Sequence, residues 1–150
     1  MSSLPVAGTL PAGVVLTPLR RIAHPLGDVV HGMKAGDDGF AGFGEAYFSH
    51  VLGGATKGWK RHRRMVLNLL VPAGTVDFHL HDEAGGHGAT VRIDAQSPAR
   101  LTVPPGLWMA FSAVGGAPAL VLNLASLPHD PAEADTAPLE RFARVPWEMP

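Results

Sequence analysis

The chain contains no cysteine. Disulfide bridges, thiolate zinc sites and cysteine nucleophiles are therefore excluded. An excess of one charge is also lacking, because 12 basic residues nearly balance 13 acidic ones and the net charge is −1. General nucleic-acid binders usually carry a strong basic excess, so we expect no nucleic-acid partner. No apolar run reaches membrane-spanning length and no secretory leader is recognisable, so we expect no membrane partner and a cytoplasmic location.

Glycine and proline are abundant, with 18 and 14 residues in a chain of 150. That length predicts one domain, residues 1–150, with an adequate core. An irregular arm is expected over residues 1–13, and a proline-rich tail over residues 131–150 that packs along the surface. The abundance of turn-forming residues is typical of short strands joined by tight turns.

Apolar segments of strand length recur along the whole chain, and no helical period lasts longer than about three turns. This spacing predicts an all-β sandwich or barrel. The expected strands cover residues 14–22, 28–33, 45–52, 65–71, 75–81, 90–94, 100–103, 107–113 and 119–125.

The basic stretch 57–64 runs directly into the apolar stretch 65–71. We expect one strand that is polar at its entrance and apolar along its length, with its charged end at the mouth of a small barrel. Alternation would place Lys60, His62 and Arg64 on one face of that strand. A solvated basic strand end with no chemical role would produce the same pattern.

Three motifs resemble the dTDP-4-dehydrorhamnose 3,5-epimerase family, whose relatives include sugar 3,4-ketoisomerases. They are Gly44-Glu45-Ala46-Tyr47-Phe48, Lys57-Gly58-Trp59 and Leu101-Thr102-Val103-Pro104-Pro105-Gly106. The resemblance covers roughly residues 14 to 131. It implies a cupin, that is, a double-stranded β-helix or jelly-roll barrel.

Two substitutions depart from metal-binding cupins. Lys60 stands where the first histidine of a His-x-His pair would be, and Met109 stands where a later histidine would be. A single imidazole does not make a metal site. We therefore expect no metal and no cofactor. A metal-dependent cupin stays open as a third option, with His62, His79 and His81 as ligands.

The sugar epimerases use a histidine base, a lysine that steadies the enolate and a tyrosine that delivers a proton. The resemblance places Lys60 at the base position, and His62 matches the second histidine of the ketoisomerase pair. We expect His62 to act as base and Lys60 as its electrostatic partner. No tyrosine stands at the family position, because the only one, Tyr47, lies elsewhere in the chain.

The strand over residues 75–81 alternates apolar and polar side chains. We expect Asp77, which matches an interior aspartate of the family, and His79 to line the pocket and tune His62. An outward polar face would give the same alternation.

Four further residues are candidates for substrate binding: Lys57, Arg64, Trp108 and Asn123. The basic ones could meet a phosphorylated small molecule, and Trp108 could stack on a base or a sugar. A buried amide such as Asn123 needs hydrogen-bond partners, which a polar cavity or the backbone would supply. A tryptophan of the core or of a dimer interface remains an equal alternative for Trp108.

The resemblance implies a metal-independent nucleotide-sugar epimerase or isomerase of deoxysugar or surface-polysaccharide biosynthesis. Its small-molecule partner would be a dTDP-4-keto-6-deoxy sugar. We also expect a homodimer, because strand-rich chains with an exposed arm often pair edges. The alternative is a catalytically reduced cupin that binds a sugar or nucleotide sugar.

Overall fold

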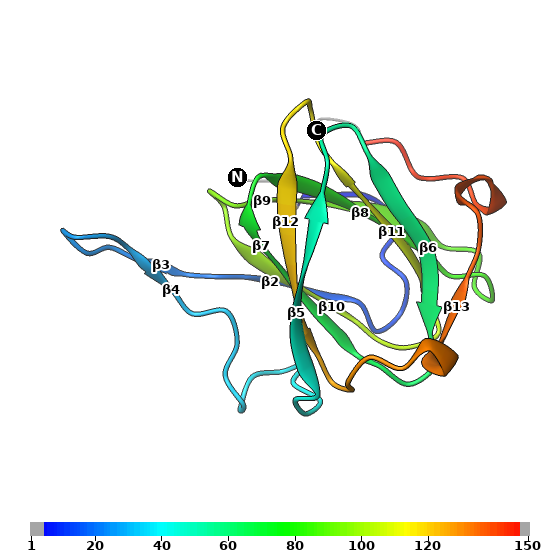
Figure 1. Ribbon diagram of the computed structural model, residues 1–150, viewed down its shortest axis with the longest axis horizontal. Coiled ribbons are helices and arrows are strands. Elements are labelled where there is room, and N and C mark those ends of the chain that lie inside the picture. Colours follow the sequence, from blue (N-terminus) through cyan, green and yellow to red (C-terminus); the bar gives the residue numbers. More distant parts are fainter. Residues whose placement is uncertain (1–4, 148–150) are drawn as a thin grey trace.

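The computed structural model describes residues 5–147 as two antiparallel β-sheets packed face to face (Figure 1). The six-stranded sheet has the order β1-β9-β8-β11-β6-β13, and the five-stranded sheet has the order β2-β10-β7-β12-β5. The strands of the first sheet are β1 (Val6–Gly8), β6 (Thr56–His62), β8 (Thr75–His81), β9 (Gly88–Asp94), β11 (Trp108–Ala113) and β13 (Ala134–Thr136). Those of the second are β2 (Val15–Pro18), β5 (Glu45–Val51), β7 (Leu67–Ala73), β10 (Ala99–Val103) and β12 (Ala119–Ala125).

The core lies between the two sheets. Strand β8 shows how alternation builds it, because Val76, Phe78 and Leu80 are buried in the main hydrophobic cluster. Their polar neighbours on β8 therefore point to the opposite face of the six-stranded sheet. The all-β jelly-roll barrel predicted from the sequence is confirmed.

The central basic and apolar stretch is two strands, which corrects the expectation of one. Strand β6 ends at His62 and pairs with β11 and β13 in the six-stranded sheet. Strand β7 begins at Leu67 and pairs with β10 and β12 in the other sheet. The chain crosses between the sheets through residues 63–66.

The two ends of the described chain are more regular than expected. In the arm, β1 pairs with β9, so this part is not irregular; residues 1–4 lie outside the described part. The tail forms two 3₁₀ turns, η1 (Pro131–Glu133) and η2 (Leu139–Arg141), on either side of β13. It packs along the six-stranded sheet through Leu139 and Phe142, as predicted, and residues 148–150 again lie outside.

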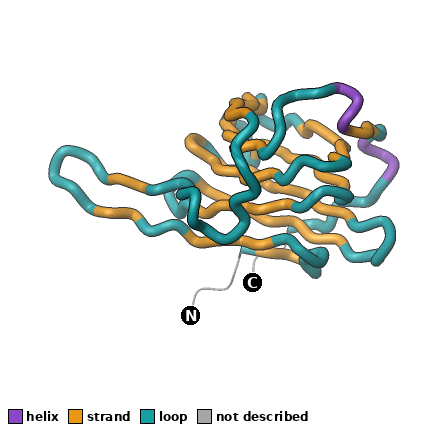
Figure 2. Tube along the Cα trace, turned by 90° about the horizontal axis from the view of Figure 1, so that it is seen from below, coloured by secondary structure: helices purple, strands orange, loops and turns teal. Residues whose placement is uncertain are grey.

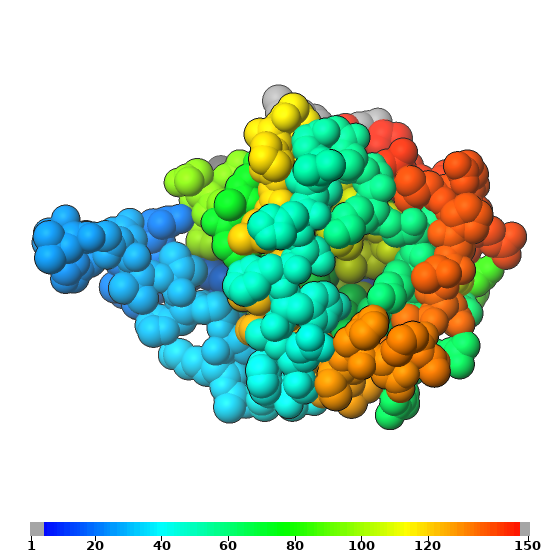
Figure 3. All heavy atoms as spheres, viewed as in Figure 1, coloured from blue at the N-terminus to red at the C-terminus, as the bar shows by residue number. Residues whose placement is uncertain are grey.

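A two-stranded hairpin, β3 (Arg21–Ile22) with β4 (Val29–Val30), projects from the barrel (Figures 1 and 2). The space-filling view shows the same segment standing clear of the main body (Figure 3). Leu26, at its turn, is 92% exposed. Within residues 5–147, no helix has the length and apolar character needed to cross a membrane.

Candidate active site

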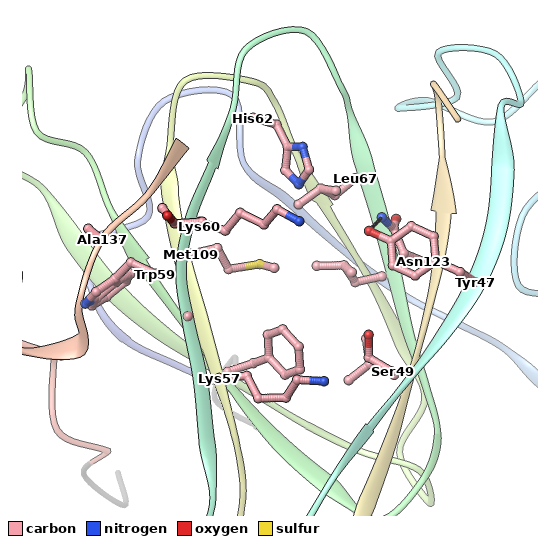
Figure 4. A pocket seen from close by; sticks show the side chains of 15 residues that line it. Tyr47, Ser49, Lys57, Trp59, Lys60, His62, Leu67, Met109, Asn123 and Ala137 are labelled. Atoms are coloured by element: carbon pink, nitrogen blue, oxygen red, sulfur yellow. Dashed lines mark hydrogen bonds between the residues drawn. The ribbon is translucent and has the colours of Figure 1, made fainter. Parts of the chain in front are cut away.

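A cavity of about 370 Å³ opens between the two sheets (Figure 4). One wall is β6, which contributes Lys57, Lys60 and His62. The opposite wall carries Tyr47 of β5 and Asn123 of β12. The remaining lining is mainly apolar and includes Leu67, Leu69, Met109, Phe111 and Val121. No aspartate or glutamate within residues 5–147 lines it.

A β-bulge places both lysines of β6 on the cavity side. Strict alternation would send Lys57 and Lys60, three positions apart, to opposite faces. In the pairing with β11, Lys60 lies opposite Met109 and Lys57 opposite Phe111, so β6 has one residue more than its partner. Such an extra residue re-aims the side chains that follow it. Lys57, Lys60 and His62 therefore share a wall.

Gly58 makes this bulge possible. Its φ is +140°, and a Cβ there would lie 2.5 Å from the Ala110 Cβ and 2.6 Å from the Ala110 Cα. A side chain at residue 58 would collide with β11, so only glycine fits.

His62 is about nine-tenths buried and is held by a carboxylate. Its Nδ1 lies 2.6 Å from the Glu133 Oε1. A carboxylate partner fixes the proton on Nδ1, so in the neutral imidazole it is Nε2 that carries the lone pair. Figure 4 shows the His62 ring pointing into the cavity beside the Lys60 amine. The lone pair therefore belongs to a group that can accept a proton from a bound molecule.

Glu133 is itself held by the turn that follows β6. Its Oε2 accepts hydrogen bonds from the backbone N–H groups of Arg63, Arg64 and Met65, at 2.8, 2.7 and 3.1 Å. Burial acts to raise the pKa of Glu133, but the hydrogen bonds from the Arg64 and Met65 backbone and from His62 outweigh it and lower the pKa from 4.5 to about 2. Glu133 is therefore a carboxylate at neutral pH. It both orients His62 and bends the chain between β6 and β7.

The only tyrosine, Tyr47, does not stand at the family position in the sequence, yet it faces His62 and Lys60 across the cavity (Figure 4). The Tyr47 hydroxyl accepts a hydrogen bond of 3.0 Å from the Asn123 amide (Figure 4). Asn123 is fixed in turn, since its Oδ1 accepts the backbone N–H of Asn68 at 3.1 Å. The Tyr47 hydroxyl keeps its own proton to donate to a bound molecule.

The known proteins that this chain matches are solved structures. Neither a scan of protein-family models nor a search of curated proteins gives a match. The fold of the dTDP sugar isomerase from Desulfovibrio desulfuricans matches with a TM-score of 0.81 and 35% identity, over 94% of this chain and 90% of that one. The chain belongs to the cupin family of dTDP-sugar isomerases and epimerases.

More distant members share the fold. The 3,4-ketoisomerase QdtA from Thermoanaerobacterium thermosaccharolyticum, in complex with TDP, is 19% identical, with a TM-score of 0.72 over 84% of this chain and 89% of that one. The 4-keto-6-deoxy sugar epimerase NovW from Streptomyces spheroides is 18% identical, with a TM-score of 0.75 over 90% of this chain and 74% of that one.

In this isomerase–epimerase family member, Asp77 and His79 do not line the cavity. Both lie on the outer face of the six-stranded sheet, because the core side of β8 is apolar. Arg92 donates two hydrogen bonds to the Asp77 carboxylate, at 2.7 and 2.9 Å. The expectation that Asp77 and His79 line the pocket and tune His62 was wrong, because both side chains lie on the outward polar face of the sheet.

His79 is instead the centre of a buried polar network under the C-terminal segment. Its ring nitrogens lie 3.0 Å from the Thr90 hydroxyl and 2.9 Å from the Ser112 hydroxyl. The Thr90 hydroxyl donates to the carbonyl of Val145. Burial lowers the pKa of His79 from 6.5 to about 4, and nearby Arg144 adds to the effect. This imidazole is neutral and structural.

Trp108 and Arg64 also lie outside the cavity lining. Trp108 is buried beside Trp59 and Phe142 on the outer side of the six-stranded sheet, and its indole N–H donates to Glu83. It is thus a core tryptophan. Arg64 follows the end of β6, where alternation no longer applies, and its side chain is exposed.

The three histidines considered as metal ligands do not converge. His62 faces the cavity, whereas His79 and His81 belong to the outer face of β8. The His81 ring stacks on Phe142 at 4.3 Å. Among residues 5–147, no group of three or more histidine, aspartate or glutamate side chains is placed to share a metal ion.

Sequence reasoning missed Tyr47 as a cavity residue and Glu133 altogether. The signal for Tyr47 was present: β5 alternates, with Tyr47 and Ser49 inward and Phe48 and His50 exposed. Glu133 offered only a local pattern, since Asp130, Pro131 and Glu133 are typical of the start of a helical turn. Its pairing with a residue 71 positions away has no signature in one sequence.

Proposed function

We propose that this protein is an epimerase or isomerase that acts on a dTDP-4-keto-6-deoxy sugar, without a metal, in deoxysugar or surface-polysaccharide biosynthesis. One observation carries the proposal. A carboxylate-oriented imidazole and a phenol face each other across a cavity that also holds two lysines. This arrangement supplies a base, a proton donor and positive charge to one bound ketone.

In the proposed reaction, His62 takes a proton from the carbon next to the C4 ketone. Its Nε2 accepts the proton, and the imidazolium that forms is stabilised by the charged Glu133 on Nδ1. Glu133 thereby acts as a positioning residue. The electron pair left on carbon moves to the ketone oxygen and forms an enolate.

Lys60 and Tyr47 serve the two remaining needs of this chemistry. A positive group close to the ketone oxygen stabilises the enolate. Lys60 can supply that charge, because it lies on the same wall as His62 and points into the cavity beside it (Figure 4). Tyr47 lies on the opposite wall and can return a proton from the other face. Delivery from that face would invert the carbon, which is epimerisation.

Two observations support the proposed substrate class: the charge of the cavity and the similarity to a known relative. The cavity is lined by lysines and lacks acidic side chains among the described residues, which suits an anionic nucleotide diphosphate. Lys57 lies over the Phe111 ring at 5.7 Å, and its amine lies 3.3 Å from the His50 carbonyl oxygen. We assign Lys57 to the diphosphate and Asn123 to holding Tyr47. The 35% identical relative is a dTDP sugar isomerase.

We further propose a homodimer in the cytoplasm. The projecting hairpin supports the dimer, because a lone two-stranded ribbon is only marginally stable in water. Ile22, Leu26 and Val29 are exposed on it. A second copy of the chain would cover these side chains.

Solvent exchange tests the proposed reaction. The purified protein is incubated with dTDP-4-keto-6-deoxyglucose in D₂O, and the recovered sugar is analysed by mass spectrometry and NMR. We expect deuterium at C3 or C5 with the unaltered protein, and a loss of at least about 100-fold in exchange rate with His62→Asn. His87→Asn, in an exposed loop outside the cavity, is the matched control and should exchange normally.

Two results would count against the enzyme. Stabilisation by dTDP in a thermal-shift assay without any exchange would show a binding protein. Equal exchange rates with and without His62 would remove the proposed base.

A further inference from the structure

The cavity holds two lysines in different circumstances. The Lys57 amine is engaged, over the Phe111 ring and near the His50 carbonyl. Lys60 is half-buried, and among residues 5–147 its amine has no hydrogen-bond or ion-pair partner. Figure 4 shows the Lys60 amine in the open part of the cavity, between the His62 ring and Met109. Of these two lysines, Lys60 is therefore the one whose amine has no contact already made within the described part of the chain.

The surroundings of Lys60 suit a nucleophile. Its cross-strand neighbour is Met109, and Leu67 lies on the cavity wall near it. A lysine amine attacks a carbonyl carbon only after it has given up its ammonium proton, and a base within reach can accept that proton. His62, two residues along the same strand face, is such a base, because its Nδ1 is already occupied by Glu133.

We propose that Lys60 forms a Schiff base with the C4 ketone of the substrate, so that a protonated imine and an enamine take the place of the ketone and the enolate in the reaction above; this rests on the proposed function. His62 Nε2 first takes a proton from the Lys60 ammonium group. The Lys60 nitrogen then attacks C4, a C–N bond forms as the C=O double bond opens, and the His62 imidazolium returns the proton to the ketone oxygen to give a carbinolamine. Loss of water then leaves a protonated imine. His62 removes the proton from the neighbouring carbon, and the electron pair moves onto the imine nitrogen to give an enamine. Reprotonation and hydrolysis restore the ketone and the free amine.

A Schiff base at C4 permits epimerisation but not 3,4-ketoisomerisation. If the enamine were protonated at C4, the ketone would move to C3 and the sugar would stay joined to Lys60 as a secondary amine. The enzyme would then be blocked. Protonation must return to the carbon that lost its proton, and Tyr47 stands on the wall opposite His62 to deliver it. The reaction we infer is therefore epimerisation next to C4, and not 3,4-ketoisomerisation.

Trapping tests this directly, because the chain has only three lysines: Lys34, Lys57 and Lys60. The full-length protein is mixed with dTDP-4-keto-6-deoxyglucose and sodium cyanoborohydride, which reduces imines in preference to ketones. We expect the intact mass to rise by one reduced sugar nucleotide, and peptide mapping to place it on Lys60. Lys60→Arg, which keeps the charge, should lose the adduct, and Lys34→Arg should keep it.

The outcomes separate the two proposals. Deuterium exchange by the unaltered protein with no adduct would overturn the Schiff base and leave the epimerase or isomerase standing. An adduct on Lys57, or equal labelling of Lys34 and Lys60, would also overturn it. Absence of both exchange and adduct would overturn both. Accumulation of a 3-keto product by an enzyme that carries the Lys60 adduct would contradict the epimerisation.

Discussion

At the scale of single residues, the site depends on one carboxylate. Glu133 connects the orientation of His62 to the turn after β6 through four short hydrogen bonds. Because it is almost fully buried, a change there affects both chemistry and stability. The proposed base is therefore only as well oriented as this turn is well formed.

Replacing Glu133 by glutamine should separate these effects. The amide oxygen can still accept from the backbone, so we expect a loss of about 1 to 3 kcal/mol in unfolding free energy in urea. The charge that stabilises the His62 imidazolium is lost, so the exchange rate should fall by about 100-fold at unchanged substrate affinity. Equal losses in affinity and rate would indicate a merely structural role.

Sequence reasoning identified much of this site at the residue scale. The structure brings Lys57, Lys60, His62 and Asn123 together in the cavity. Sequence reasoning failed where one pattern fits either face of a strand, because the alternation around Asp77 does not say which side is the core. The match of Asp77 to an interior aspartate of the family argued for a pocket, but the polar side of β8 is covered by the C-terminal segment instead.

At the scale of elements, the bulge in β6 sets the geometry of the cavity wall. Gly58→Ala would place a methyl group against Ala110 on β11 at a φ of +140°. We expect a loss of about 2 kcal/mol in unfolding free energy, together with weaker substrate binding as Lys57 is displaced. Gly36→Ala, where a Cβ meets nothing within 4 Å, is the matched control. Equal stability of the two variants would mean that the bulge tolerates a side chain.

The His79 network predicts acid sensitivity. The pKa of His79 is lowered to about 4 in the folded state, so the unfolded chain binds a proton first as the pH falls. Unfolding free energy should be nearly insensitive to this group above about pH 7 and should decrease by about 3 kcal/mol as the pH falls to about 4. Glu133, whose pKa is lowered to about 2, should add a further loss between about pH 4.5 and pH 2.

His79→Gln provides the check on this assignment. Glutamine can still form hydrogen bonds but does not titrate. The unfolding free energy of the variant, measured in urea, should therefore change less between pH 7 and pH 4.5 than that of the unaltered protein. An unchanged pH dependence in the variant would show that the acid sensitivity arises elsewhere.

The division of residues 57–71 into two strands was the main error in the predicted elements. Both halves have strand character, and nothing local marks a break. The break is made by Glu133, which takes up the N–H groups of residues 63–65 from a distant part of the chain. By contrast, β8 and β12 were predicted with their observed bounds, because a turn residue flanks each apolar run.

At the scale of the whole molecule, the hairpin is the feature that the barrel does not explain. Leu26 and Val29 are 92% and 48% exposed on a two-stranded ribbon that leaves the main body (Figure 3). If a second copy covers them, Leu26→Asp with Val29→Asp should shift the mass measured by light scattering from dimer to monomer. Leu52→Asp, 74% exposed but on the barrel, should remain a dimer. A monomer in the unaltered protein would contradict the proposed interface.

The central claim is that a base and a proton donor act from opposite walls of one cavity. Tyr47→Phe in D₂O tests it most directly, because the variant removes the donor and leaves His62 in place. We predict that deuterium still enters the recovered substrate while product formation falls by about 100-fold or more. Normal product formation, or loss of exchange and product together, would contradict it.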